Sequence, residues 1–173
     1  MQEISKKRIN WIPALVFQSI ALALGIILDL LTLRGEKTAA GGWALLSLSI
    51  LALAVAFWAI MHYECWKSLP ERYRETTPGK AIGFIFIPFY SFYWAFTSIP
   101  GLAKGFYEYG RRNGIKEIDN KTGLGIAFAV VFVCYNTIGL IPGFTSILGV
   151  ASFVLFILFY KDIVDYANRV LES

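Results

Sequence analysis

The stretch FIFIPFYSFYWAF, at residues 84–96, holds eight aromatic residues in thirteen positions. Pro88 interrupts it once, and Thr77-Pro78-Gly79-Lys80 comes shortly before it. Aromatic rings, especially those of Trp and Tyr, concentrate at membrane–water interfaces. Whether this segment crosses a bilayer or only dips into it therefore decides the topology of the chain.

The composition of the whole chain is that of a membrane protein. Of its 173 residues 57% are apolar and 16% charged, and the mean hydropathy is +0.58, whereas soluble domains are about 25% charged. The net charge of +4 comes from patches of mixed sign, which argues against nucleic-acid binding and is typical of juxtamembrane Lys and Arg meeting anionic lipid. Cys65 and Cys134 are expected to be free, buried thiols.

Four long tracts that are almost free of charge are expected to cross the membrane, because a spanning helix needs about 20 apolar residues. The spans are expected at about 11–33, 43–63, 122–140 and 144–160. The tract from 11 to 33 is too long for the apolar core of a signal peptide, so it is expected to be a retained helix. Residues 122–160 carry no charge and would form one helix of almost ~60 Å, about twice the core thickness. Gly139, Pro142 and Gly143 therefore predict a turn.

Two segments remain outside these four spans. The aromatic segment, residues 81–103, carries no charge and is long enough to cross. Thr77 and Pro78 predict the start of a helix just before it. At the other end of the chain, residues 161–171 place apolar side chains on one helical stripe. This pattern predicts an amphipathic helix that lies in the interface or packs on a partner.

The distribution of positive charge favours a topology in which the aromatic segment does not cross. Five crossings would leave seven Lys and Arg on the inner side and nine on the outer side. If the segment enters and leaves by the same face, fourteen lie inside and only Arg34 and Lys37 outside, as expected for cytoplasmic loops. The sequence thus predicts a compact all-α bundle of four transmembrane helices plus a re-entrant or in-plane aromatic segment, with the N-terminus cytoplasmic. Five transmembrane helices remain the alternative.

Three polar residues are expected within the spans. Asp29 is the strongest, because an ionisable residue in a span is costly and suggests a function, although it lies close enough to the end of its tract to reach water. Gln18 and Asn136 are the others. With four crossings Asn136 falls on the Asp29 side, and with five it falls nearer Gln18. A contact between Asp29 and Asn136 would therefore test the topology.

No set of residues predicts catalysis or a bound metal. His62-Tyr63-Glu64-Cys65 contains the only histidine, and zinc or haem iron would need further ligands. His62 and Glu64 are expected to be helix-end residues that reach water or lipid head groups. No nucleophile–base pair, phosphate loop or carboxylate pair is apparent, so the chain is expected to be non-enzymatic and without a cofactor.

Small residues four apart predict close helix packing. The pairs are Ala21 and Gly25, Ala52 and Ala56, and Gly123 and Ala127. Their spacing lets helix backbones approach, either within one chain or between copies.

The stretch TPGKAIGFIFIPFYSFYWAF, residues 77–96, resembles a recurrent segment of uncharacterised bacterial multi-spanning membrane proteins. In those proteins a Pro-Gly-Lys start precedes an aromatic I-P-F-[FY]-x-x-Y-W core. The resemblance covers about 20–30 residues, roughly from Thr77 to Lys104. It implies a bacterial inner-membrane setting and no particular activity.

The leading functional hypothesis is a membrane subunit or scaffold that packs with itself or with other membrane proteins. Its aromatic segment, with Phe89, Tyr90, Tyr93 and Trp94, would be a lipid-facing anchor or a docking surface. The first alternative is a homo-oligomeric channel or small-solute transporter in which Asp29, Gln18 or Asn136 contacts solute. The second is a protein that binds quinone, carotenoid or haem by stacking on Tyr93 and Trp94.

Overall fold

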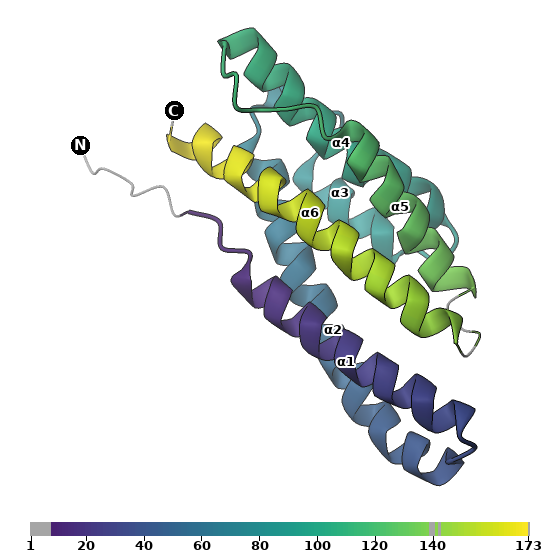
Figure 1. The fold of residues 1–173 in the computed structure, drawn as a ribbon. Helices are drawn as coiled ribbons and strands as arrows, with labels where there is room; N and C mark the ends of the chain where they lie inside the picture. The colour runs from purple at the N-terminus through teal and green to yellow at the C-terminus, as the bar shows by residue number, and fades with distance from the viewer. Residues whose placement is uncertain (1–7, 139–140, 142, 173) are drawn as a thin grey trace.

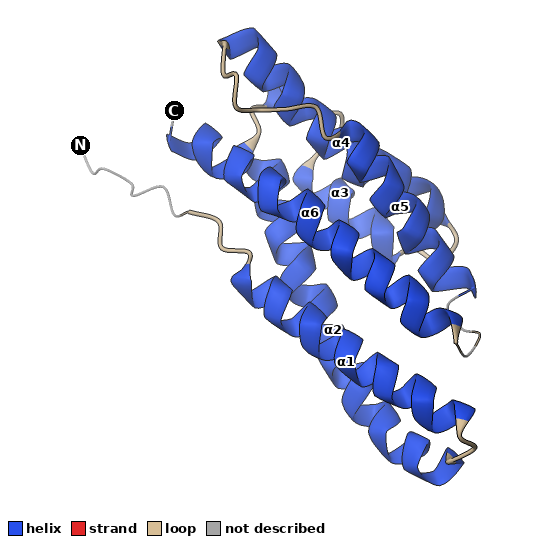
Figure 2. Ribbon diagram, in the orientation of Figure 1, coloured by secondary structure: helices blue, strands red, loops and turns tan. Residues whose placement is uncertain are grey.

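The computed structural model describes residues 8–138, 141 and 143–172, and gives only the backbone for residues 37–42. The described part is helical throughout and contains no strand (Figure 2). Its helices are α1 (Ile12–Leu33), α2 (Lys37–Ser68), α3 (Pro78–Gly83), α4 (Tyr90–Asn113), α5 (Thr122–Thr137) and α6 (Phe144–Glu172), with single 3-10 turns at Glu71–Tyr73 and Phe84–Phe86 (Figure 1). The all-α prediction is confirmed.

Three helices are long and apolar enough to cross a membrane, namely α1, residues Trp43–Ser68 of α2, and α6. Their large apolar side chains point outward as well as inward, with Leu45 75% and Ile147 68% exposed. Outward-facing apolar residues suit a lipid environment. Helix α5 has 16 residues and measures about 24 Å, which is short for a hydrocarbon core of about 30 Å. The structure thus makes a multi-pass membrane protein plausible. Its described part contains three helices long enough to cross, whereas the sequence predicted four crossings.

Helix α6 differs from the prediction because it continues without a break to Glu172. A separate helix was expected at residues 161–171, but no Gly or Pro follows Gly149 within α6 to interrupt it. Ile163, Val164 and Ala167, from the expected apolar stripe, are buried in the chain's own core. The partner of this stripe is therefore the rest of the bundle.

Contacts between distant segments define the two ends of the bundle. At the first end the Ile9 backbone N–H donates to Asn168 Oδ1 (2.7 Å), which ties the start of α1 to the last turns of α6. Lys121, before α5, pairs there with Asp162 (2.8 Å), and this hydrogen bond raises the pKa of Lys121. We call this the terminal end. The opposite, turn end holds the α1–α2 connection and the start of α6 (Figure 1).

Residues 75–104 fold back on themselves. At one end Lys104 pairs with Glu75 (Nζ to Oε1, 2.6 Å). Further along, Ser98 Oγ (3.0 Å) and Trp94 Nε1 (3.2 Å) both donate to the Ala81 carbonyl. The stretch from α3 to Phe86 therefore runs antiparallel to the first half of α4. We call residues 75–104 the aromatic hairpin.

The start of this hairpin follows local capping rules. Thr77 Oγ1 accepts a hydrogen bond from the Lys80 backbone N–H (3.4 Å), and Pro78 is the first helical residue. Both features were expected from the sequence, because Thr satisfies a free N–H at a helix start and Pro has none to satisfy.

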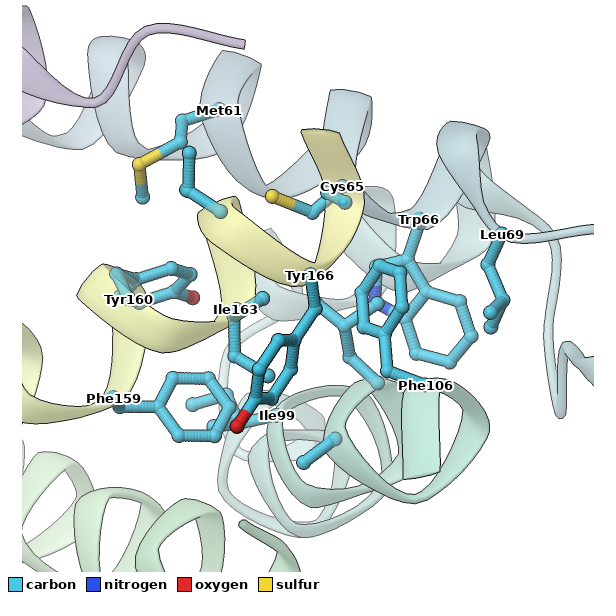
Figure 3. Close-up of a cluster of buried hydrophobic side chains, with 14 of the residues drawn as sticks. Met61, Cys65, Trp66, Leu69, Ile99, Phe106, Phe159, Tyr160, Ile163 and Tyr166 are labelled. Carbon is cyan, nitrogen blue, oxygen red and sulfur yellow. The ribbon is translucent and has the colours of Figure 1, made fainter. Parts of the chain in front are cut away.

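The core lies where α2, α4 and α6 meet (Figure 3). Trp66 of α2 and Leu69, the residue just after α2, pack near Phe106 of α4, while Phe159 and Ile163 approach from α6. All five side chains are fully buried. Cys65 is a buried free thiol, as predicted, whereas the free Cys134 is only partly buried.

The predicted small-residue contacts are not the ones that hold the chain together. A Cβ added at Gly25 or Gly123 would meet no atom within 4 Å. The close approaches lie elsewhere, at Gly105 against Leu69 and Tyr73. The prediction that Gly25 and Gly123 bring helices together within the chain is thus wrong, because no atom of the other described helices lies close to either position.

Candidate functional site

The most concentrated polar cluster surrounds His62, inside the core. Helix α2 carries Trp58, His62 and Trp66 four residues apart, which places them on one face. The Trp58 ring stacks on the imidazole, with centroids 5.3 Å apart and an interplanar angle of 16°. The His62 side chain is 0% exposed. It therefore depends entirely on protein groups for its hydrogen bonds.

Both imidazole nitrogens have partners on other helices. His62 Nδ1 lies 2.8 Å from Tyr160 Oη of α6, and Nε2 lies 2.9 Å from Ser98 Oγ of α4. Trp66 Nε1 also donates to His62 Nε2 (3.1 Å), and Trp58 Nε1 donates to Tyr160 Oη (2.8 Å). The cluster joins three helices at one point.

The direction of the Trp66 bond indicates the protonation of the imidazole. An indole N–H can only donate, so His62 Nε2 presents its lone pair to Trp66. The ring proton then sits on Nδ1 and is donated to Tyr160 Oη. Ser98 has a single hydroxyl proton, which goes either to the Ala81 carbonyl (3.0 Å) or to His62 Nε2 (2.9 Å), but not to both. The Trp66 contact therefore fits a neutral histidine.

These contacts correct the expected role of His62. It was predicted to reach water or head groups at a helix end, but α2 continues for six residues beyond it to Ser68, and Tyr160 and Ser98 cover it. Glu64 is partly exposed. Two open depressions, of about 300 and 670 Å³, are lined by other residues. Within the described residues no group of His, Cys, Asp and Glu could hold a metal. The His62 cluster is thus suited to positioning helices.

Asp29 forms a second buried polar contact, at the turn end. Its Oδ1 accepts from the Gly143 backbone N–H (2.8 Å), and its Oδ2 accepts from Ser146 Oγ (2.6 Å) and the Ser146 backbone N–H (3.3 Å). A carboxylate is favourable at the positive N-terminal end of a helix. Asp29 of α1 therefore caps α6, and its side chain is 7% exposed in total.

The three predicted intramembrane polar residues are not brought together. Asn136 is exposed, and its Nδ2 donates to the Phe132 carbonyl of its own helix (2.8 Å). No hydrogen bond joins it to Asp29 within the described part of the chain. Gln18 is partly buried in α1. The hydrogen-bond partner of Asp29 is instead the start of α6.

Replacing Asp29 with Ala is expected to lower the free energy of unfolding by about 1–3 kcal/mol, because the two N–H groups at the start of α6 lose a charged acceptor. A double-mutant cycle with Ser146→Ala in detergent micelles measures the coupling. Asp165→Ala is the matched control, because its carboxylate is 51% exposed and pairs only within α6, so a change within about 0.5 kcal/mol is expected there. Additivity of Asp29→Ala and Ser146→Ala would contradict the capping role.

The aromatic hairpin divides its rings between its interior and its surface. Trp94 is buried, lies at 20° to Tyr90 with centroids 5.8 Å apart, and meets Phe84 edge-on at 4.8 Å. Phe89 is 85% and Tyr93 65% exposed. Phe89 follows Pro88 at the tip with a φ of 61°, which is costly for a bulky side chain. The tip thus holds an exposed ring in a strained turn.

Comparison with known protein families, curated proteins and solved structures finds no match for this chain. The resemblance at residues 77–96 stays a prediction. Ser98 and Tyr160, which complete the His62 cluster, were not singled out from the sequence. The repeat of Trp58, His62 and Trp66 at four-residue spacing is the signal that could have marked the buried face of α2.

Proposed function

We propose that the chain is a non-enzymatic, multi-pass membrane subunit with four crossings, α1, α2, α5 and α6, and with its aromatic hairpin inserted from the cytoplasmic face. The observation that carries the proposal is the fold-back of the hairpin. Since Glu75 and Lys104 form an ion pair, the two ends of the segment lie at the same depth relative to the membrane. A segment that crossed the bilayer would separate them by about 30 Å.

The contact of Asp29 with α6 supports four crossings over five. If α1 crosses outward, its last turn lies on the outer side. With four crossings α6 also starts on the outer side, whereas with five it starts on the inner side. Asp29 bonds to Gly143 and Ser146 at the start of α6, so both segments lie at one end of the bundle.

The charge distribution supports a cytoplasmic terminal end. Arg34 follows α1 directly, at the turn end. The described basic residues of the segments joined at the terminal end are Arg8, Lys67, Arg72, Arg74, Lys80, Lys104, Arg111, Arg112, Lys116, Lys121, Lys161 and Arg169. A Lys and Arg excess of this kind marks the cytoplasmic side.

The hairpin tip would lie inside the hydrocarbon core without reaching its far side. From Lys104, which pairs with Glu75, α4 runs back to its first residue, Tyr90, and at helical rise this part of α4 covers about 21 Å. This is less than a core about 30 Å thick. Phe89 and Tyr93 would there anchor the subunit in lipid or meet a second copy or another membrane subunit. The channel and cofactor hypotheses gain no comparable support, because Asp29 is bonded to α6 and Trp94 is buried within the hairpin.

Cysteine accessibility in vesicles of known orientation tests the topology. In a Cys134→Ser background, Gly79→Cys and Arg112→Cys are expected to react with a membrane-impermeant maleimide from the same side. Both positions are exposed, and a Cβ at Gly79 meets no atom within 4 Å. Arg34→Cys is the control for the opposite side, and the native Cys65 is buried. Labelling of Gly79→Cys and Arg112→Cys from opposite sides would establish five crossings.

The subunit role is tested on the protein purified in a mild detergent. Mass spectrometry of the particle is expected to find a second copy or a co-purifying membrane protein. A strictly monomeric particle without any partner would contradict this role.

A further inference from the structure

An open groove of about 670 Å³ lies at the terminal end, between the segment that leads into α1 and the second half of α6. Residues 8–12 form one wall, with Asn10 and Trp11. Lys161, Val164 and Asp165 of α6 are among the residues of the other wall. We call it the α1–α6 groove.

The groove lies where two spans meet water. Trp11 starts the first long apolar tract, and Lys161 is the first charged residue after the tract that ends at Tyr160. Trp and Lys at such positions are typical of the membrane interface, where lipid head groups lie. This placement rests on α1 and α6 being spans, as proposed above.

The hydrogen-bonding groups of the groove suit an anion. Its two carboxylates already have cations, since Asp162 pairs with Lys121 (2.8 Å) and Asp165 with Arg169 (2.8 Å). In the described part of the chain, the Lys161 ammonium and the Trp11 indole N–H have no polar partner. Asn10 uses its Oδ1 to accept from the Ile12 backbone N–H (3.0 Å), which leaves its amide N–H groups to donate. Three residues with donors thus line a groove whose acids are neutralised.

We propose that the α1–α6 groove binds the phosphate of a phospholipid head group. Lys161 supplies the charge, while Trp11 and Asn10 donate hydrogen bonds. Ile12 lines the same groove, is 57% exposed, and gives the first carbons of the lipid an apolar contact. A lipid is favoured over a soluble phosphate because the donors lie at the interface and next to apolar side chains.

Native mass spectrometry of the purified chain with added phosphatidylglycerol tests the proposal. Lys161→Gln is expected to weaken lipid binding roughly tenfold, as for the loss of one charge-assisted hydrogen bond. Lys161→Arg is expected to retain binding. Lys80→Gln removes an exposed charge at the same end but outside the groove, and is the matched control with unchanged binding. Lys161 is exposed, so its variants are expected to keep the thermal midpoint of the parent.

Equal affinity of Lys161→Gln and the parent would overturn the proposal, as would equal losses in Lys161→Gln and Lys80→Gln. Glycerol phosphate, a head group without acyl chains, is expected to compete only weakly; competition as strong as that of the lipid would overturn the lipid assignment. These affinities do not depend on vesicle orientation. If cysteine labelling establishes five crossings while Lys161→Gln still weakens lipid binding, the topology alone is wrong.

Discussion

Replacing His62 with Ala is expected to lower the free energy of unfolding by about 3–5 kcal/mol, the largest effect of any single polar substitution considered for this chain. The substitution empties a fully buried site. It also leaves the Trp66 N–H and the Tyr160 hydroxyl without their imidazole partner. A buried polar group left unsatisfied costs about 1–3 kcal/mol, and the cavity adds to this cost.

The measurement is the thermal unfolding midpoint in detergent, which is expected to fall by roughly 6–20 °C. Glu64→Ala is the matched control, because Glu64 lies two residues further along α2 and is partly exposed. Tyr160→Phe separates the cavity from the hydrogen bond, since it keeps the whole ring but removes the hydroxyl that contacts His62 Nδ1, and a loss of about 1 kcal/mol is expected. If His62→Ala and Glu64→Ala shifted the midpoint equally, His62 would not hold the three helices together.

A single methyl group added at Gly105 is expected to destabilise the bundle by about 2–3 kcal/mol. The new Cβ would lie 2.5 Å from Leu69 Cδ2 and 2.7 Å from the Tyr73 carbonyl oxygen. Leu69 can rotate away, but the Tyr73 oxygen belongs to the backbone. Helix α4 would therefore have to move away from the segment that follows α2, opening the core around it.

Gly123→Ala is the matched control, because the same methyl group there meets no atom within 4 Å. A change within about 0.5 kcal/mol is expected at this exposed position. Circular dichroism melts of both variants provide the comparison. A loss of stability at Gly123 as large as that at Gly105 would show that the Gly123 face is covered, as in a contact between copies.

Local signals in the sequence predicted several elements correctly. The long apolar tracts marked α1, α2 and α6, because an apolar helix can be recognised from its own residues. Thr77 and Pro78 marked the start of α3, because capping depends on only a few neighbouring residues. The charged patch that begins at residue 161 predicted the start of a separate helix, but this prediction was wrong. Helix α6 continues through it because no residue there disrupts the helical backbone.

The sequence by itself thus determined that the chain is helical, that its surface is apolar enough for lipid, and that positive charges gather in particular connections. These properties follow from the composition and spacing of neighbouring residues. Only the tertiary structure decided that Trp94 and Ser98 bond to Ala81 within the aromatic hairpin, that Asp29 caps α6, and that His62 is buried between Ser98 and Tyr160. Those contacts join residues 13 to 117 positions apart. No local pattern specifies such partners, because they are set by how the helices pack against one another.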